Sequence, residues 1–181
     1  MHSIKDHTKL IKQCLKGKRK AQFELYEIHK VYLYGICMRY GKTKFEAEDM
    51  LQEGFYKILR DLKQYKGQVP FQAWIRKVII NSCLMHIRKY KKLSYSELFE
   101  SEADAVLGFD VELLSSNRAK AIIHLIQTLP ENQQTVFNLK GIDGYSFAEI
   151  SSMLDIKEAT LRSHYLRARK RLQHLLNKEL N

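Results

Sequence analysis

The segment after Pro70 limits the possible folds more than any other part of the sequence. From Phe71 to Tyr90 it contains neither proline nor glycine, so one continuous helix is allowed. Its apolar residues recur at helical spacing and form one face, which consists of Ile75, Val78, Ile79 and Cys83. We expect this helix to pack by that face against other helices.

Three further helices are predicted before it, over residues 8–16, 18–40 and 45–62. Gly17 and Gly41 follow the first two, at the position where glycine commonly ends a helix. No segment in this half shows the alternation of apolar and polar residues that indicates a strand. We therefore expect an all-α fold in which residues 1–92 form a four-helix bundle.

Charge is distributed unevenly along the chain, whose formal net charge is +11. Residues 1–92 contain 21 Lys and Arg against 8 acids, and residues 118–181 contain 10 against 6. Residues 93–117 contain six acids and no Lys or Arg. Two basic domains indicate a polyanionic partner. We interpret the acidic stretch as a mostly extended linker with apolar anchor points, although it could also pack as a loop against a neighbouring domain.

Residues 118–181 are predicted to form a second helical domain that contains a helix-turn-helix. Ser146 and Glu149 form an S-x-x-E capping box, and a short turn at Asp155 leads to a last helix from about Glu158. The predicted packing stripe of that helix is Leu161, Tyr165, Ala168, Leu172 and Leu175. Its open face carries Arg162, Ser163, Leu166, Arg167 and Lys170.

A basic, hydroxyl-bearing open face after a tight turn is typical of helices that enter the major groove of DNA. Arginine can bind guanine bidentately, serine can contact bases or phosphates, and leucine can contact a thymine methyl group. The open face is therefore a candidate DNA-binding surface. The alternative is a plain antiparallel helix pair with a solvated basic face.

The helix after Pro70 carries a second stripe, which consists of Trp74, Lys77, Asn81, Leu84 and Arg88. Unpaired nucleic acid is bound by such a set, because aromatic rings stack on bases, cations contact phosphates and amides contact base edges. The stripe thus predicts a single-strand contact. Alternatively, Trp74 is a half-buried core residue and the cations are merely solvated.

Several function classes find no support in the sequence. The seven histidines are scattered, and there is no HExxH motif, no Gly-rich phosphate loop and no GxSxG motif. We expect no metal, no cofactor and no enzymatic activity. The three cysteines fall in apolar helical settings, which suggests buried thiols in a reducing cytoplasm. No apolar run is long enough to insert in a membrane.

Two groups of residues resemble the bacterial RNA polymerase sigma factors. Residues 47–55, 65–67 and 71–75, with Asn81 and Arg88, are similar to sigma region 2. Residues 129–131, 144–150 and 160–169 are similar to sigma region 4. The two regions occur in the family's order and cover nearly the whole chain. With a linker in place of region 3, the chain resembles the extracytoplasmic-function (ECF) group.

The resemblance implies domains at residues 1–92 and 118–181, joined by the acidic linker 93–117. It implies core RNA polymerase as a partner, through the clamp helices of the largest subunit and the flap. Promoter DNA and an anti-sigma factor are the other implied partners. The residues implied for polymerase binding are Asp49, Gln52 and Glu53. Those implied for the −10 element are Tyr65, Lys66, Phe71, Trp74, Lys77, Asn81 and Arg88, and those for the −35 element are Arg162, Ser163, Leu166, Arg167 and Lys170.

Two alternatives remain at this point. A helix-turn-helix regulator would share the C-terminal half, but it does not need Gln52 and Glu53 together with an aromatic loop. A nucleic-acid enzyme would need an acid/base pair, for which Glu24 with Glu27 or Glu46 with Asp49 are the available carboxylates. The chain departs from many relatives after Gly67, where Gln68 stands in place of an acid. This leaves the preferred base at the −10 pocket open.

Overall fold

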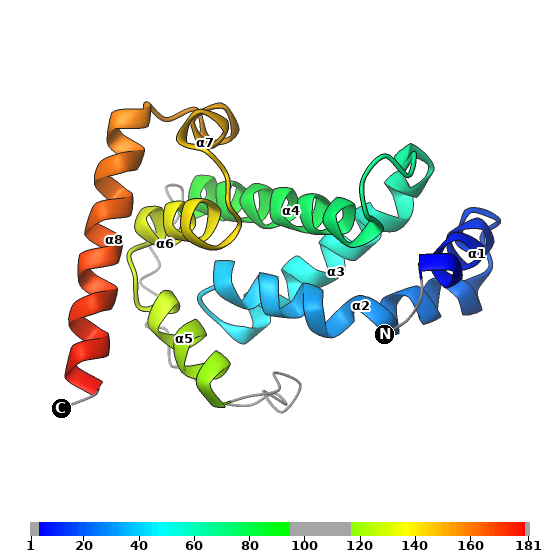
Figure 1. Ribbon diagram of the computed structural model, residues 1–181, viewed down its shortest axis with the longest axis horizontal. Helices are drawn as coiled ribbons and strands as arrows, with labels where there is room; N and C mark the ends of the chain where they lie inside the picture. Colours follow the sequence, from blue (N-terminus) through cyan, green and yellow to red (C-terminus); the bar gives the residue numbers. More distant parts are fainter. Residues whose placement is uncertain (1–3, 95–116, 180–181) are drawn as a thin grey trace. The chain divides into compact units, whose positions relative to one another are not determined.

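The computed structural model describes residues 4–94 and 117–179, and every regular element in them is helical (Figure 1). The all-α fold is therefore confirmed. The described residues belong to two compact units, one on each side of the undescribed segment. The predicted acidic linker lies outside the described residues, except at its ends, where helices extend to Ser94 and begin at Asn117.

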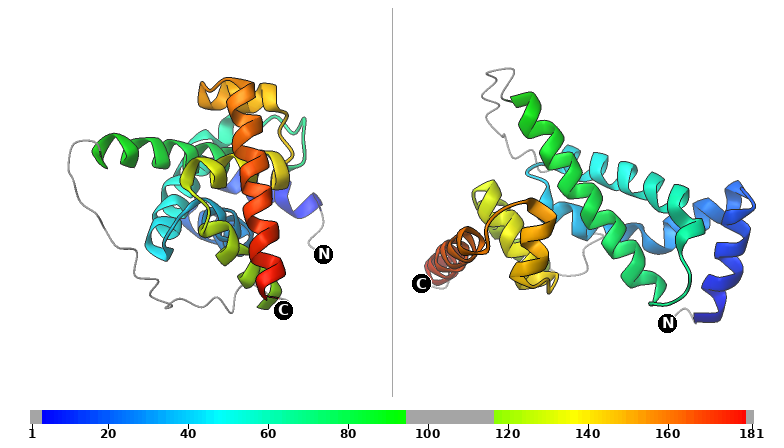
Figure 2. Two further views of the ribbon diagram at one scale, coloured as in Figure 1. Left: turned by 90° about the vertical axis from the view of Figure 1, so that its left-hand side faces the viewer. Right: turned by 90° about the horizontal axis from the view of Figure 1, so that it is seen from above.

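The first unit consists of the four predicted helices. These are α1 (Ile4–Leu15), α2 (Arg19–Tyr40), α3 (Lys44–Asp61) and α4 (Phe71–Ser94), with a short 3-10 turn, η1 (Leu62–Gln64), after α3. Further views show α4 lying along α3, with α2 beside both (Figure 2). The side chains fully buried between them include Leu25, Leu33, Met50, Ile58, Ile75 and Ile79.

Helices α3 and α4 approach closely at Gly54, which is buried. A Cβ atom added there would overlap Cδ1 of Ile79 and would lie 3.4 Å from Cβ of Ser82. Ile79 is itself 0 % exposed, so its side chain has no open space to move into. Gly54 therefore sets the spacing of the two helices that carry the candidate site.

The second unit consists of α5 (Asn117–Gln127), α6 (Glu131–Phe137), the π-helical turn η3 (Asn138–Ile142), α7 (Phe147–Leu154) and α8 (Glu158–Glu179). Its core contains Leu125, Leu129, Ala168 and Leu172, with Phe137 and Leu175 packed at the edge. Gly141 does not end the helix that begins at Glu131, since the backbone continues as the π-helical turn. The chain reverses at Gly144, whose φ is +83°.

The start of α7 forms the predicted capping box. The Glu149 backbone N–H donates to Oγ of Ser146 at 3.2 Å, and the Ser146 backbone N–H donates to Oε2 of Glu149 at 2.7 Å. The helix ends at Asp155, which adopts the left-handed conformation with φ 57°. Aspartate tolerates this conformation better than most residues, so Asp155 is suited to end α7 before the short turn into α8.

Within the described ranges 4–94 and 117–179, no helix is both long enough and apolar enough to cross a membrane.

Candidate nucleic-acid interface

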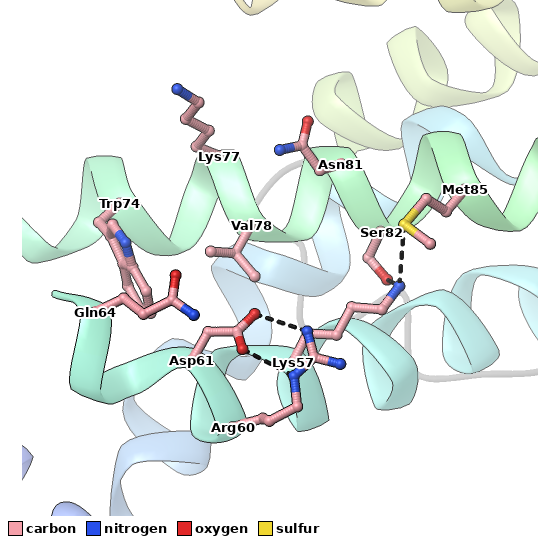
Figure 3. A pocket seen from close by; sticks show the side chains of 10 residues that line it. All are labelled: Lys57, Arg60, Asp61, Gln64, Trp74, Lys77, Val78, Asn81, Ser82 and Met85. Atoms are coloured by element: carbon pink, nitrogen blue, oxygen red, sulfur yellow. Dashed lines mark hydrogen bonds and ion pairs between the residues drawn. The ribbon is translucent and has the colours of Figure 1, made fainter. Parts of the chain in front are cut away.

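A groove of about 440 Å³, lined by both polar and apolar residues, lies between α3 and α4 of the first unit (Figure 3). Its volume is in the roughly 300–1,000 Å³ range of ligand-binding clefts. The lining residues from α3 and η1 are Lys57, Arg60, Asp61 and Gln64, and those from α4 are Trp74, Lys77, Val78, Asn81, Ser82 and Met85. The groove therefore combines an aromatic ring, two amides, three cations and one acid.

The α3 side of the groove is fixed by hydrogen bonds. Nζ of Lys57 donates to Oγ of Ser82 at 3.0 Å and lies 3.8 Å from Sδ of Met85. Nε and Nη2 of Arg60 each donate to one carboxylate oxygen of Asp61, both at 2.8 Å. The hydrogen bond from Arg60 lowers the pKa of the Asp61 carboxyl below its usual value. Asp61 is thus an ionised acceptor at neutral pH.

Trp74 is held by a cluster of aromatic rings at the start of α4. Its ring is stacked on that of Phe71, with 5.8 Å between the ring centroids, and is tilted against that of Tyr65, with 5.6 Å between the centroids. Tyr65 is fixed in turn by a hydrogen bond from its hydroxyl to the carbonyl oxygen of Val69 at 2.9 Å. Phe71 is only 7 % exposed, whereas Trp74 is partly exposed and lines the groove. Trp74 is consequently the ring that a ligand in the groove can reach.

Three of the predicted single-strand residues, Trp74, Lys77 and Asn81, come together at the groove. Tyr65 is partly buried and Lys66 is exposed in the loop before α4, and neither lines the groove. Arg88 is exposed about two turns beyond Asn81. The predicted stripe is interrupted at Leu84, which is 5 % exposed and belongs to the core.

The sequence prediction missed the α3 side of the groove. Lys57, Asp61 and Gln64 are spaced by four and three residues, so a polar stripe could have indicated them. Their position opposite Trp74 depends on how α3 and α4 align, which no local pattern specifies. Among the described residues, no group of three His, Cys, Asp or Glu side chains is arranged to hold a metal ion.

The residues implied for polymerase binding lie earlier on α3. Asp49 and Gln52 are exposed, and the side chain of Glu53 is 42 % exposed. Oε2 of Glu53 lies 3.6 Å from Nδ1 of His86, a buried residue of α4. The three polar side chains form an accessible surface that shares no residue with the groove lining.

The open face of α8 has the predicted polarity. Leu161 and Ala168 are 0 % exposed and Leu172 is 8 % exposed, while the predicted DNA-facing residues Arg162, Ser163, Leu166, Arg167 and Lys170 are all exposed. Tyr165 is partly buried and contacts the rings of Phe137 and Phe147. The predicted DNA-facing side of this helix is therefore a basic surface that includes one exposed leucine, Leu166.

Arg162 and Ser163 already have partners on the protein. Nη2 of Arg162 donates to Oε2 of Glu158 at 2.8 Å, and its guanidinium lies 4.5 Å from the ring centroid of Phe147. The hydroxyl of Ser163 donates to the carbonyl oxygen of Ala159 at 3.1 Å, which leaves its oxygen able to accept. These contacts fix the direction of the Arg162 side chain.

Behind the aromatic cluster, Nε2 of His7 lies 3.2 Å from Nε2 of His29, and Phe71 contacts both rings. Burial, followed by the charge of His7, lowers the pKa of His29 from 6.5 to about 4. Between these pH values the unfolded chain binds more protons than the folded chain. The contribution of His29 to the stability of the first unit is therefore complete above pH 6.5 and is lost as the pH falls toward 4.

We expect the free energy of unfolding to fall by up to ~1.4 kcal/mol per pH unit in this window because of His29. Urea titrations followed by the fluorescence of the single tryptophan, Trp74, report on this unit. His29→Gln should flatten the pH dependence, and His174→Gln, at an exposed position of α8, should not. Equal slopes for the wild type and His29→Gln would contradict the prediction.

Comparison with known proteins gives two matches to family models. Residues 25–93 match sigma-70 region 2, and residues 119–172 match sigma-70 region 4. The ECF RNA polymerase sigma factor SigW of Bacillus subtilis is 31% identical, over 93% of this chain and 95% of the relative. The ECF RNA polymerase sigma-E factor of Haemophilus influenzae is 24% identical, over 91% of this chain and 92% of the relative.

The fold is also similar to a solved structure, that of the sigma factor RpoE in complex with the anti-sigma factor NepR from Bartonella quintana. The TM-score is 0.54 at 21% identity, over 85% of this chain and 95% of that chain. This likeness supports the fold of the chain.

Proposed function

Because this chain belongs to the ECF sigma factors, which bind RNA polymerase and recognise promoters, we propose that the groove between α3 and α4 holds the unpaired strand of the −10 element. The observation that carries this proposal is the convergence of Trp74, Lys77 and Asn81 with Lys57 and Arg60 around one groove. An aromatic ring, amides and cations are the groups that single strands need. Tyr65, Lys66 and Arg88 extend the contact beyond the groove, and Phe71 supports Trp74 from the core.

Strand opening then follows from differential binding. Extruding a base costs a few kcal/mol of lost stacking and pairing. Stacking on an aromatic side chain returns about 1–3 kcal/mol per base, and the cations neutralise the negative charge of the phosphates. Because only the open strand can reach Trp74, the holoenzyme shifts the equilibrium toward the open duplex without ATP hydrolysis.

The second unit is proposed to contact the −35 element through the open face of α8. The tight turn and the capping box before α8 support the proposal that α8 is the second helix of a helix-turn-helix, the helix that would enter the major groove. The contacts would come from Arg162, Ser163, Leu166, Arg167 and Lys170. The functional domains in this proposal are residues 1–92 and 118–181, joined by residues 93–117.

Replacing Arg162 by alanine tests this assignment. We expect a loss of ~1–3 kcal/mol in binding that depends on the base at one −35 position. Arg171→Ala is the matched control. This exposed arginine lies nine residues, or two and a half turns, beyond Arg162 and therefore on the side of α8 opposite to Arg162. Holoenzyme affinities for promoters with each base at each −35 position measure the effect. An equal loss on every sequence would make Arg162 a phosphate contact instead.

The polymerase contact is proposed to involve Asp49, Gln52 and Glu53. Acidic and amide groups on an otherwise basic domain suit a protein partner better than DNA. In the family this partner is the pair of clamp helices of the largest subunit, and the flap is the corresponding partner of region 4. An anti-sigma factor, the class of partner bound to RpoE in the similar structure, is proposed as a regulator. We propose that the protein acts in the cytoplasm, together with RNA polymerase.

Run-off transcription with purified core polymerase on a genomic fragment library tests the function as a whole. We expect a discrete set of start sites that share −35 and −10 elements and that require this protein. If the protein fails to bind core polymerase and selects no start site, it is a DNA-binding protein of another kind.

A further inference from the structure

Asp61 differs in charge from the rest of the groove. Asp61 is the only acid among the ten residues that line the groove. Of the three cations in the lining, Lys57 and Arg60 come from α3, the helix that also carries Asp61. In Figure 3, Asp61 extends from α3 toward α4, between Trp74 and Lys57 in this view. A site that only bound phosphates would be weakened by a carboxylate, which would repel them.

The Asp61 carboxylate is oriented and still able to accept hydrogen bonds. Arg60 donates one hydrogen bond to each oxygen, at 2.8 Å, and so occupies two of about four acceptor positions. The Asp61 side chain is 23% exposed, so its remaining lone pairs are accessible. Because it is ionised, it can accept hydrogen bonds but cannot donate them.

An unpaired base exposes its pairing edge, on which the four bases differ. Adenine, cytosine and guanine each carry an amino group there, whereas thymine presents two carbonyl oxygens around one ring N–H. A carboxylate accepts from an amino group and is repelled by a carbonyl oxygen. We infer that Asp61 determines the base accepted in this groove, favouring a base with an exocyclic amino group and disfavouring thymine. This inference rests on the proposed function.

The other lining residues are compatible with one nucleotide in this orientation. Trp74 offers a ring for stacking on the base, and the cations Lys77 and Arg60 can contact the flanking phosphates. Asn81, also in the lining, can donate to a ring nitrogen or carbonyl of the same base. The groove thus holds the base between a stacking surface and an acceptor.

A promoter library in which each −10 position carries all four bases tests the inference. With wild-type holoenzyme we expect one position at which thymine reduces transcription about tenfold relative to the best amino-bearing base. Asp61→Asn should remove most of this difference, since an amide can donate to a thymine carbonyl as well as accept. Asp61→Glu, which keeps the carboxylate, should retain it. Glu24→Gln, an exposed carboxylate of α2, should leave the base profile unchanged.

The possible results separate the two proposals. If wild-type holoenzyme transcribes the library but no −10 position disfavours thymine, or if Asp61→Asn has the wild-type base profile, Asp61 does not select the base and the proposed function stands. If wild-type protein and core polymerase transcribe no member of the genomic library, the proposed function fails and this inference fails with it. The base profile is a ratio within one protein, so a variant of lower stability is still interpretable.

Discussion

Holoenzyme that carries Trp74→Ala is expected to bind promoter DNA and to leave it closed. Trp74 is the accessible ring of the groove, and one base–aromatic stack contributes ~1–3 kcal/mol, so the equilibrium constant for opening should fall by roughly 5- to 150-fold. Polymerase binding should be unaffected, because the residues proposed for it do not line the groove. Permanganate reactivity of thymines near −10 measures opening, and a polymerase pull-down measures assembly.

The control for Trp74→Ala is Phe23→Ala, which removes another exposed aromatic ring of the first unit. Phe23 is 66% exposed on α2 and has no place in the groove. Phe71→Ala is unsuitable, because Phe71 is buried and its truncation should cost ~3–5 kcal/mol of stability. Unchanged permanganate reactivity in Trp74→Ala would show that the groove does not hold the melted strand.

Gly54→Val is expected to destabilise the first unit severely. Even the first atom of a side chain at this position overlaps Ile79, and valine adds two more atoms between α3 and α4. Overpacking of a close-packed core costs ~1–3 kcal/mol or more. In a unit of this size each kcal/mol lowers the Tm by roughly 4–8 °C. Thermal unfolding followed by Trp74 fluorescence measures the shift.

Ala73→Val is the control for a β-branched side chain on an exposed position of the same unit. Ala73 is exposed on α4, so valine there should cost under ~1 kcal/mol. A Tm for Gly54→Val equal to that of Ala73→Val would mean that α3 and α4 can separate without loss of stability. The groove between them would then be less rigid than its packing indicates.

Most of the fold could be predicted because its determinants are local. The apolar period of α4 and the glycines after α1 and α2 specify elements within a few residues of sequence. The capping box at Ser146 and the stripe from Leu161 to Leu175 do the same for the second unit. The π-helical turn could not be predicted in this way, because Gly141 is compatible with the end of a helix as well as with a wider turn.

The site was only partly predictable, because its two sides come from different helices. Trp74, Lys77 and Asn81 share one helix and could be grouped by spacing. Asp61 joins them only because α3 packs along α4, and this alignment depends on tertiary contacts. The burial of Phe71 has the same origin, since His7 of α1 and His29 of α2 pack against its ring.

The contacts of Arg162 with Glu158 and Phe147 have a consequence for the lifetime of the DNA complex. A flexible arginine loses rotamer entropy when it is immobilised by a ligand, at a cost of ~0.5–1.5 kcal/mol. Here the ion pair and the ring restrict the side chain before DNA arrives. Much of that ordering is complete in the unbound protein, and because affinity differences between related complexes lie mostly in the dissociation rate, we expect slower release from a matching sequence.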